Sequence, residues 1–160
     1  MDVRKLIATL ALVAACSSKP TPAAAPAPTP TRAPAPSATS NELGASTPAA
    51  AVRGYLAAAQ TQDLQAMARV WGTKDGSALS TLPREEMEKR ELINIRCLNH
   101  DTYDIISDAP ATAGKRVFAV LLRRKDQTRT TNFYTVTGPS GRWYVESFQP
   151  EPLADFCARR

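Results

Sequence analysis

Histidine, cysteine and glycine are scarce in this chain of 160 residues, which has one histidine, three cysteines and seven glycines. With a single histidine and no Cys-x-x-Cys pair, the sequence lacks the set of closely spaced ligands that a metal site usually needs. No serine lies in a nucleophile-elbow sequence, and no glycine-rich phosphate loop is present. We therefore expect no metal and no cofactor, and the composition favours a non-enzymatic protein.

Long apolar runs are also lacking. A membrane-spanning helix needs about 20 apolar residues, and no run in this sequence is that long. Residues 6–15 form the apolar run at the N-terminus, after the basic pair Arg4-Lys5 and before a site of small residues. This order is typical of a secretory signal peptide.

The end of that run, Val13-Ala14-Ala15-Cys16, resembles the bacterial lipobox. The resemblance implies a signal peptide over residues 1–15, cleavage before Cys16, and diacylglycerol and palmitate on that cysteine. Two or three acyl chains give a stable membrane anchor. Ser17 stands where an aspartate favours inner-membrane retention, so we expect the periplasmic face of the outer membrane in a Gram-negative cell. The alternative is an ordinary secretory signal followed by a chance cysteine.

Residues 16–46 are rich in proline, alanine, serine and threonine, with seven prolines between Pro20 and Pro36. Such a segment cannot bury enough apolar surface to offset the entropy of ordering it. We expect a disordered tether, which serves either as a spacer of useful length or as a passive linker.

The remaining 114 residues, 47–160, are enough for one small domain. Thr47-Pro48 predicts a helix start, and a buried face follows at Val52, Tyr55, Leu56 and Ala59.

Further helices follow the first one. Asp63 can cap a second helix that Gly72 ends, residues 74–82 are predicted to be a loop, and a third helix is predicted from Pro83 to about Leu98. Residues 92–98 are the ambiguous part, because they also suit a strand.

Beyond the helices the apolar pattern changes to alternation. Strands are predicted over residues 102–107, 116–124, 128–137 and 142–148. The short connections imply an antiparallel meander, and residues 117–122 are apolar on both faces, which suits a covered inner strand. The predicted class is α+β, with three N-terminal helices packed on a four-stranded antiparallel sheet.

This element order resembles the nuclear transport factor 2-like, or cystatin-like, cone-shaped fold. The matching segments are AVRGYLAA at 51–58, REEMEKR at 84–90 and GRWYVE at 141–146. The resemblance implies a curved sheet with helices in its concave face. It also implies a homodimer paired through the outer sheet face. It does not specify an activity, since that superfamily holds isomerases, dehydratases, carriers and non-catalytic binding domains.

His100 and Asp101 are the candidates for chemistry. A histidine beside carboxylates can act as a general base, and His100 with Cys97, Asp101 and Asp104 can also be considered as metal ligands. The alternative is a polar turn between the third helix and the first strand. Aromatic candidates for a pocket lining, which are equally candidates for plain core, are Tyr55, Trp71, Phe118, Tyr134 and Trp143.

Positive charge gathers in residues 115–160, which hold nine lysines and arginines against four carboxylates. This favours an anionic envelope surface as a partner, or else a charged sheet edge that resists pairing. An exported chain is not expected to bind nucleic acid.

With Cys16 lipidated, Cys97 and Cys157 remain, and export places them in an oxidising compartment. We expect them to form a disulfide that holds the C-terminal tail; the alternative is two buried free thiols.

The function that these features favour is a lipid-anchored cell-envelope protein with a small non-enzymatic domain for binding or self-assembly. The alternative is a small lyase or isomerase that uses His100 or Asp101 as general base in an apolar pocket.

Overall fold

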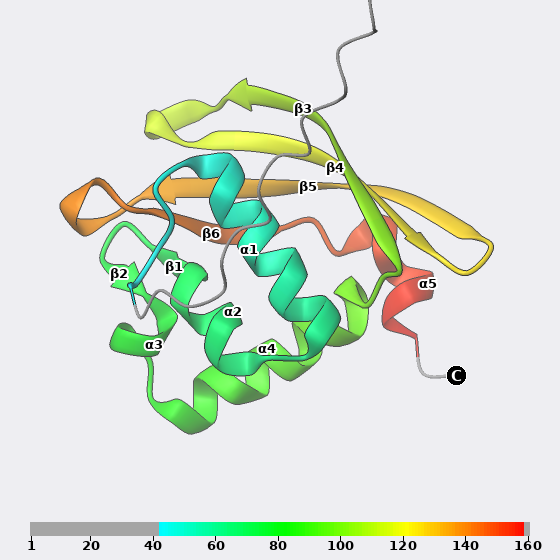
Figure 1. The fold of residues 1–160 in the computed structure, drawn as a ribbon, viewed down its shortest axis with the longest axis horizontal. Coiled ribbons are helices and arrows are strands. Elements are labelled where there is room, and N and C mark those ends of the chain that lie inside the picture. The colour runs from blue at the N-terminus through cyan, green and yellow to red at the C-terminus, as the bar shows by residue number, and fades with distance from the viewer. Residues whose placement is uncertain (1–41, 159–160) are drawn as a thin grey trace, which may run out of the picture. The chain divides into compact units, whose positions relative to one another are not determined.

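A four-stranded antiparallel sheet is the centre of the computed structural model, which describes residues 42–158 (Figure 1). Its strands are β3 (Thr102–Pro110), β4 (Arg116–Arg124), β5 (Gln127–Thr137) and β6 (Trp143–Phe148). They pair in chain order, β3-β4-β5-β6, as the alternating sequence pattern predicted. The sheet therefore confirms the antiparallel meander, and β3 is longer than expected at its C-terminal end.

Most of the helices precede the sheet in the chain. They are α1 (Pro48–Thr61), α2 (Leu64–Val70), α3 (Ala78–Thr81) and α4 (Arg84–Leu98), with α5 (Ala154–Cys157) after the sheet. The class is thus α+β as predicted, but with helices before and around the sheet in place of three at the N-terminus. The segment 92–98, which was ambiguous in the sequence, is helical.

Local chemistry explains where the first two helices begin. The Oγ1 atom of Thr47 accepts a hydrogen bond from the backbone N–H of Ala50 at 3.1 Å, and Pro48 occupies the first turn. The Oδ1 atom of Asp63 accepts from the N–H of Ala66 at 2.9 Å and caps α2 in the same way. Both predicted helix starts are confirmed.

The hydrophobic core lies between α1 and one face of the sheet. In Figure 1 the helices lie below the sheet, with α1 against it, and α1 contacts β4, β5 and β6. Alternate residues of β4, namely Phe118, Val120 and Leu122, are fully buried on this face. The helix α4 packs on α1, α2 and α5, so it forms a wall on the side of α1 away from the sheet.

The segment after α2 is more regular than the expected loop. The helix α2 ends at Val70 with Trp71 as its C-cap, so Gly72 follows the helix end directly, as expected. Gly72 is not left-handed, however, and pairs with Ser77 in a two-stranded ribbon, β1 (Gly72–Thr73) with β2 (Gly76–Ser77). A Cβ atom at Gly72 would lie 2.2 Å from the carbonyl oxygen of Gly76, so the glycine permits this close pairing. The expected loop 74–82 accordingly contains β2 and the short helix α3.

Residues 42–46, which the composition assigned to the tether, lie against β6. The N–H of Ala45 donates to the carbonyl of Trp143 at 2.8 Å, and the N–H of Trp143 donates back at 2.9 Å. Arg142 also donates to the carbonyl oxygens of Leu43 and Gly44. Over residues 42–158, no helix has both the length and the apolar character to cross a bilayer.

Candidate functional site

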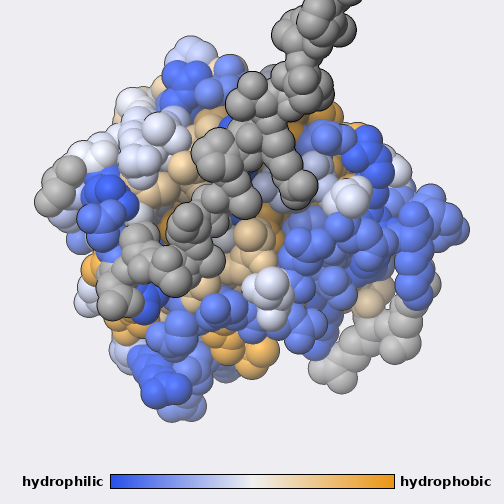
Figure 2. Space-filling view, in the orientation of Figure 1, coloured by the Kyte–Doolittle hydropathy of each residue, from blue (hydrophilic) through white to orange (hydrophobic). Residues whose placement is uncertain are grey.

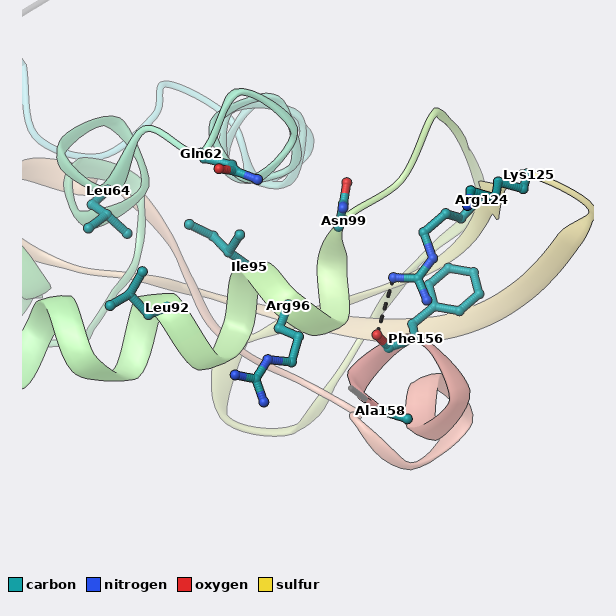
Figure 3. A pocket seen from close by; sticks show the side chains of 10 residues that line it. All are labelled: Gln62, Leu64, Leu92, Ile95, Arg96, Asn99, Arg124, Lys125, Phe156 and Ala158. Atoms are coloured by element: carbon teal, nitrogen blue, oxygen red, sulfur yellow. Dashed lines mark hydrogen bonds between the residues drawn. The ribbon is translucent and has the colours of Figure 1, made fainter. Parts of the chain in front are cut away.

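An open groove of about 670 Å³ lies where α2, α4, α5 and the β4–β5 hairpin meet (Figure 3). One part of its lining is aliphatic, with Leu64 at the start of α2 facing Leu92 and Ile95 on α4. Ile95 is buried, whereas Leu92 is 58% exposed, a high value for a leucine. The groove thus leaves a large apolar side chain in contact with solvent.

The other part of the groove is cationic. Arg124 and Lys125, from the end of β4 and the turn after it, line this part together with Phe156 of α5. The guanidinium of Arg124 lies 4.1 Å from the centre of the Phe156 ring, and its Nη1 donates to the Phe156 carbonyl at 3.1 Å. These contacts fasten the hairpin to α5.

Arg96 lies between the two parts, on α4. Within residues 42–158, neither Arg96 nor Lys125 has a carboxylate partner within 4.0 Å. All the charged residues in the lining are basic, so the groove is suited to a negatively charged group. Ile93, the next residue on α4, is also 58% exposed but does not line the groove. Figure 2 shows a hydrophobic patch over α4 and a hydrophilic surface over the hairpin end of the molecule.

A disulfide joins two walls of this groove. Cys97 of α4 and Cys157 of α5 are bonded, with their Cα atoms 4.1 Å apart. Each cysteine is next in sequence to a lining residue, Arg96 on one side and Phe156 on the other. The bridge therefore fixes α5 against α4 and sets the separation of the walls. These are the two cysteines that the sequence analysis expected to pair, and Cys16 lies outside the described residues.

His100 and Asp101, the two candidates for a general base, each contact neighbouring groups of the domain. The imidazole of His100 is buried, its Nδ1 donates to the Leu98 carbonyl at 2.6 Å, and its ring packs edge-on against Tyr103. Asp101 is exposed, and its Oδ2 accepts from the backbone N–H of Lys125 at 2.6 Å, which supports the hairpin turn. Neither residue lines the groove.

The ligand set considered for a metal is likewise dispersed. Cys97 is in the disulfide, and Asp104 forms an ion pair with Arg123 on the sheet. In the part of the chain that the structure describes, no three potential metal ligands come together.

The five aromatic residues considered for a pocket do not line the groove, nor a smaller hollow of about 330 Å³ beside α3. Tyr55 and Phe118 are fully buried core residues, and Trp71, Tyr134 and Trp143 are half-buried. The hydroxyl of Tyr55 accepts from the Asn94 amide at 3.0 Å. Trp71 and Trp143 pack against the core, and the hydroxyl of Tyr134 accepts a hydrogen bond from the Gln149 amide at 3.2 Å.

Glu91 is the residue that the sequence reasoning missed. Its side chain is fully buried on α4, and within residues 42–158 neither carboxyl oxygen has a hydrogen-bond partner. Burial, together with a smaller effect of the nearby carboxylates of Glu88 and Asp63, raises the pKa of Glu91 to about 8. The signal was available, because Glu91 lies four residues from both Met87 and Ile95 on the buried stripe of α4.

Neither a scan against protein-family models nor searches of curated proteins and of solved structures find a match to this chain.

Proposed function

We propose that this chain is a lipid-anchored cell-envelope protein whose folded domain acts by binding, and that the groove between α2, α4 and α5 is its binding site. The observation that supports this most directly is the composition of the groove lining. Exposed aliphatic surface from Leu92 lies on the same helix as Arg96, and Lys125 lines the hairpin end of the groove; neither basic group has a carboxylate partner among the described residues. Ligand sites typically combine apolar walls with a few polar groups that orient the ligand.

The enzyme alternative finds less support. A general base must reach the proton that it removes. His100 is packed against Tyr103 with one ring nitrogen bonded to a backbone carbonyl, and Asp101 is occupied by the hairpin turn. Neither side chain lines the groove or the smaller hollow beside α3.

The nuclear transport factor 2-like fold also stays a proposal. Its support is the helix α1 lying along one face of a four-stranded meander, together with the sequence segments that resemble that family. Such domains commonly pair through the outer sheet face. Here that face presents the half-buried Val117, Ala119 and Leu121, so self-assembly is the second mode of action that we propose.

The anchor rests on the sequence Val13-Ala14-Ala15-Cys16. The test is intact-mass spectrometry of protein extracted from the membrane fraction. We expect a chain that lacks residues 1–15 and carries the mass of diacylglycerol, and we expect Cys16→Ser to leave the membrane fraction. A Cys16→Ser chain that stays membrane-bound with its mass otherwise unchanged would refute the anchor.

The binding site can be tested with 8-anilinonaphthalene-1-sulfonate, an apolar anionic dye, and the chain carrying Cys16→Ser. Leu92→Asp places a negative charge on the groove wall, and we expect the dye affinity to fall by about tenfold or more, because apolar surface is lost and charge repulsion is added. Ile93→Asp is the matched control, since Ile93 is exposed to the same extent and does not line the groove. Equal affinities for the two variants would overturn the proposed site.

A further inference from the structure

At the aliphatic end of the groove, an acidic side chain is buried next to the lining. Glu91 stands one turn before the lining residue Ile95 on the buried stripe of α4, and it has no exposed surface. Within residues 42–158, neither of its carboxyl oxygens has a hydrogen-bond partner, and no basic group lies within 4.0 Å of them. A negative charge at this position is strongly unfavourable, because it has neither water nor a partner.

The titratable groups around Glu91 make a negative charge there still less favourable. Asp63 at the start of α2 and Glu88 on α4 are close enough for their charges to act on the Glu91 carboxyl. Asp63 caps α2, and Glu88 pairs with Arg84 at 2.6 Å. On α1, burial raises the pKa of Tyr55, so its hydroxyl stays neutral over the range in which carboxyls ionise. An ionised Glu91 would therefore be repelled by α2 and by its own helix.

The same two helices form the aliphatic wall of the groove. Leu64 of α2 faces Leu92 and Ile95 of α4 (Figure 3). The helix α2 has seven residues, of which two are buried, so few of its side chains hold it to the core. Solvent already reaches this wall, since Leu92 is 58% exposed. A separation of α4 from α2 here would bring water to Glu91 and leave the sheet intact.

We propose that Glu91 is a pH switch for the groove: its neutral form keeps α4 against α2 and the aliphatic wall closed, and loss of its proton to water separates the two helices at this wall. This inference rests on the proposed function, since it concerns the regulation of the same groove. The closed state keeps the proton and the open state releases it, so rising pH favours the open state. A ligand that covers the closed wall is expected to bind more weakly as the pH rises.

Dye binding at two pH values tests the switch in the chain carrying Cys16→Ser. The sulfonate of 8-anilinonaphthalene-1-sulfonate stays ionised from pH 6 to pH 9. We expect the dye affinity to be about fivefold or more weaker at pH 9 than at pH 6, because the open fraction does not bind. In Glu91→Gln, which cannot ionise, the two affinities should agree within about twofold. Glu86→Gln, on the exposed face of α4, should keep the wild-type difference.

Hydrogen exchange tests whether the opening is local. After correction for the intrinsic exchange rate, we expect the amides of α2 and of residues 91–98 to lose about tenfold or more of their protection between pH 6 and pH 8. They should exchange faster than the amides of β4 and β5 at pH 8, and Glu91→Gln should abolish the loss. Equal protection of α4 and β4 at pH 8 would mean that the chain opens only as a whole, which would overturn the switch.

The failure of this inference and the failure of the proposed function are distinguishable. Dye binding that depends on Leu92 but is equally strong at pH 6 and pH 9 would overturn the switch and leave the binding function standing. The same weakening in Glu91→Gln as in the wild type would also overturn the switch alone. Absence of dye binding at both pH values would overturn the binding site and its regulation together.

Discussion

At the scale of single residues, the buried carboxyl of Glu91 makes stability depend on pH. Its pKa is about 8 in the folded chain, against an ordinary value of 4.5. The folded state therefore keeps a proton that the unfolded state releases between these two values. The contribution of Glu91 to the free energy of unfolding is fully present below pH 4.5. It falls as the pH rises from 4.5 to 8 and is absent above pH 8. The slope within that window reaches about 1.4 kcal/mol per pH unit.

Glu91→Gln should flatten this dependence and stabilise the chain at pH 9, since it removes the charge and preserves the shape. Urea unfolding measured from pH 5 to 9 would show the change. Glu86→Gln is the control, because Glu86 pairs with Arg90 on the exposed face of α4 and should change stability by less than about 1 kcal/mol. A wild-type stability that rises from pH 5 to 8, or an unchanged slope in Glu91→Gln, would contradict the assignment.

Gly44 tests whether the segment before α1 belongs to the folded domain. Its φ is +73°, and a Cβ atom there would lie 2.8 Å from both the Cβ atom of Arg142 and the ring of Tyr144. Gly44→Ala should therefore combine backbone strain with overpacking and lower the free energy of unfolding by about 2–4 kcal/mol.

Gly114→Ala is its matched control, with a φ of +71° and no atom within 4 Å of the added Cβ. Gly114→Ala should lower the free energy of unfolding only by the backbone strain, about 1–2 kcal/mol. Equal losses for Gly44→Ala and Gly114→Ala in thermal unfolding would mean that residues 42–46 do not pack on β6 as described.

At the scale of elements, the bridge between Cys97 and Cys157 holds the C-terminal helix to α4. The two cysteines are 60 residues apart, for which the chain-entropy model gives about 4 kcal/mol. Cys97→Ala with Cys157→Ala should lower the free energy of unfolding by about that amount and weaken dye binding in the groove. Leu153 and Phe156 are both buried, so we expect their apolar contacts to keep the tail packed on the domain in this variant.

The control for the bridge is a count of free thiols. The chain carrying Cys16→Ser is isolated from the envelope without reductant, denatured and alkylated, and we expect no thiol to react. Two titratable thiols, or a loss of less than about 1 kcal/mol in the double variant, would contradict a stabilising bridge.

Elements are also the scale at which the sequence is most informative. Thr47 and Asp63 mark helix starts by capping chemistry that acts within a few residues, and the apolar run 117–122 marks the strand β4. The end of α4 was less clear, because residues 92–98 suit a strand as well as a helix. The ribbon at Gly72 was not predictable in this way, because it depends on a close approach to Gly76.

The site was harder to predict than the fold. The groove joins residues from α2, α4, the β4–β5 turn and α5, which are distant in sequence. No local pattern links Leu64 to Phe156. Of the aromatic residues considered for a pocket, Tyr55 and Phe118 fill the core instead.

At the scale of the whole molecule, the outer face of the sheet is the expected homodimer interface. Leu121 lies on the face opposite the buried Val120 and is only half-buried in one chain. We expect a dimer by sedimentation at micromolar concentration and a monomer for Leu121→Arg, because a charge in the centre of a pairing face is costly to bury. Ile93→Arg, on α4, should stay dimeric. A wild-type monomer would rule out the interface.

The central claim is that this domain binds its ligand in the groove, and chemical-shift mapping by NMR tests it most directly. Titrating 8-anilinonaphthalene-1-sulfonate into the isotopically labelled chain carrying Cys16→Ser should shift backbone amides in four separate stretches, 62–64, 92–99, 124–125 and 156–158, with one common saturation curve. Shifts confined to the outer face of the sheet around Leu121, or no saturable shifts within residues 42–158, would contradict it.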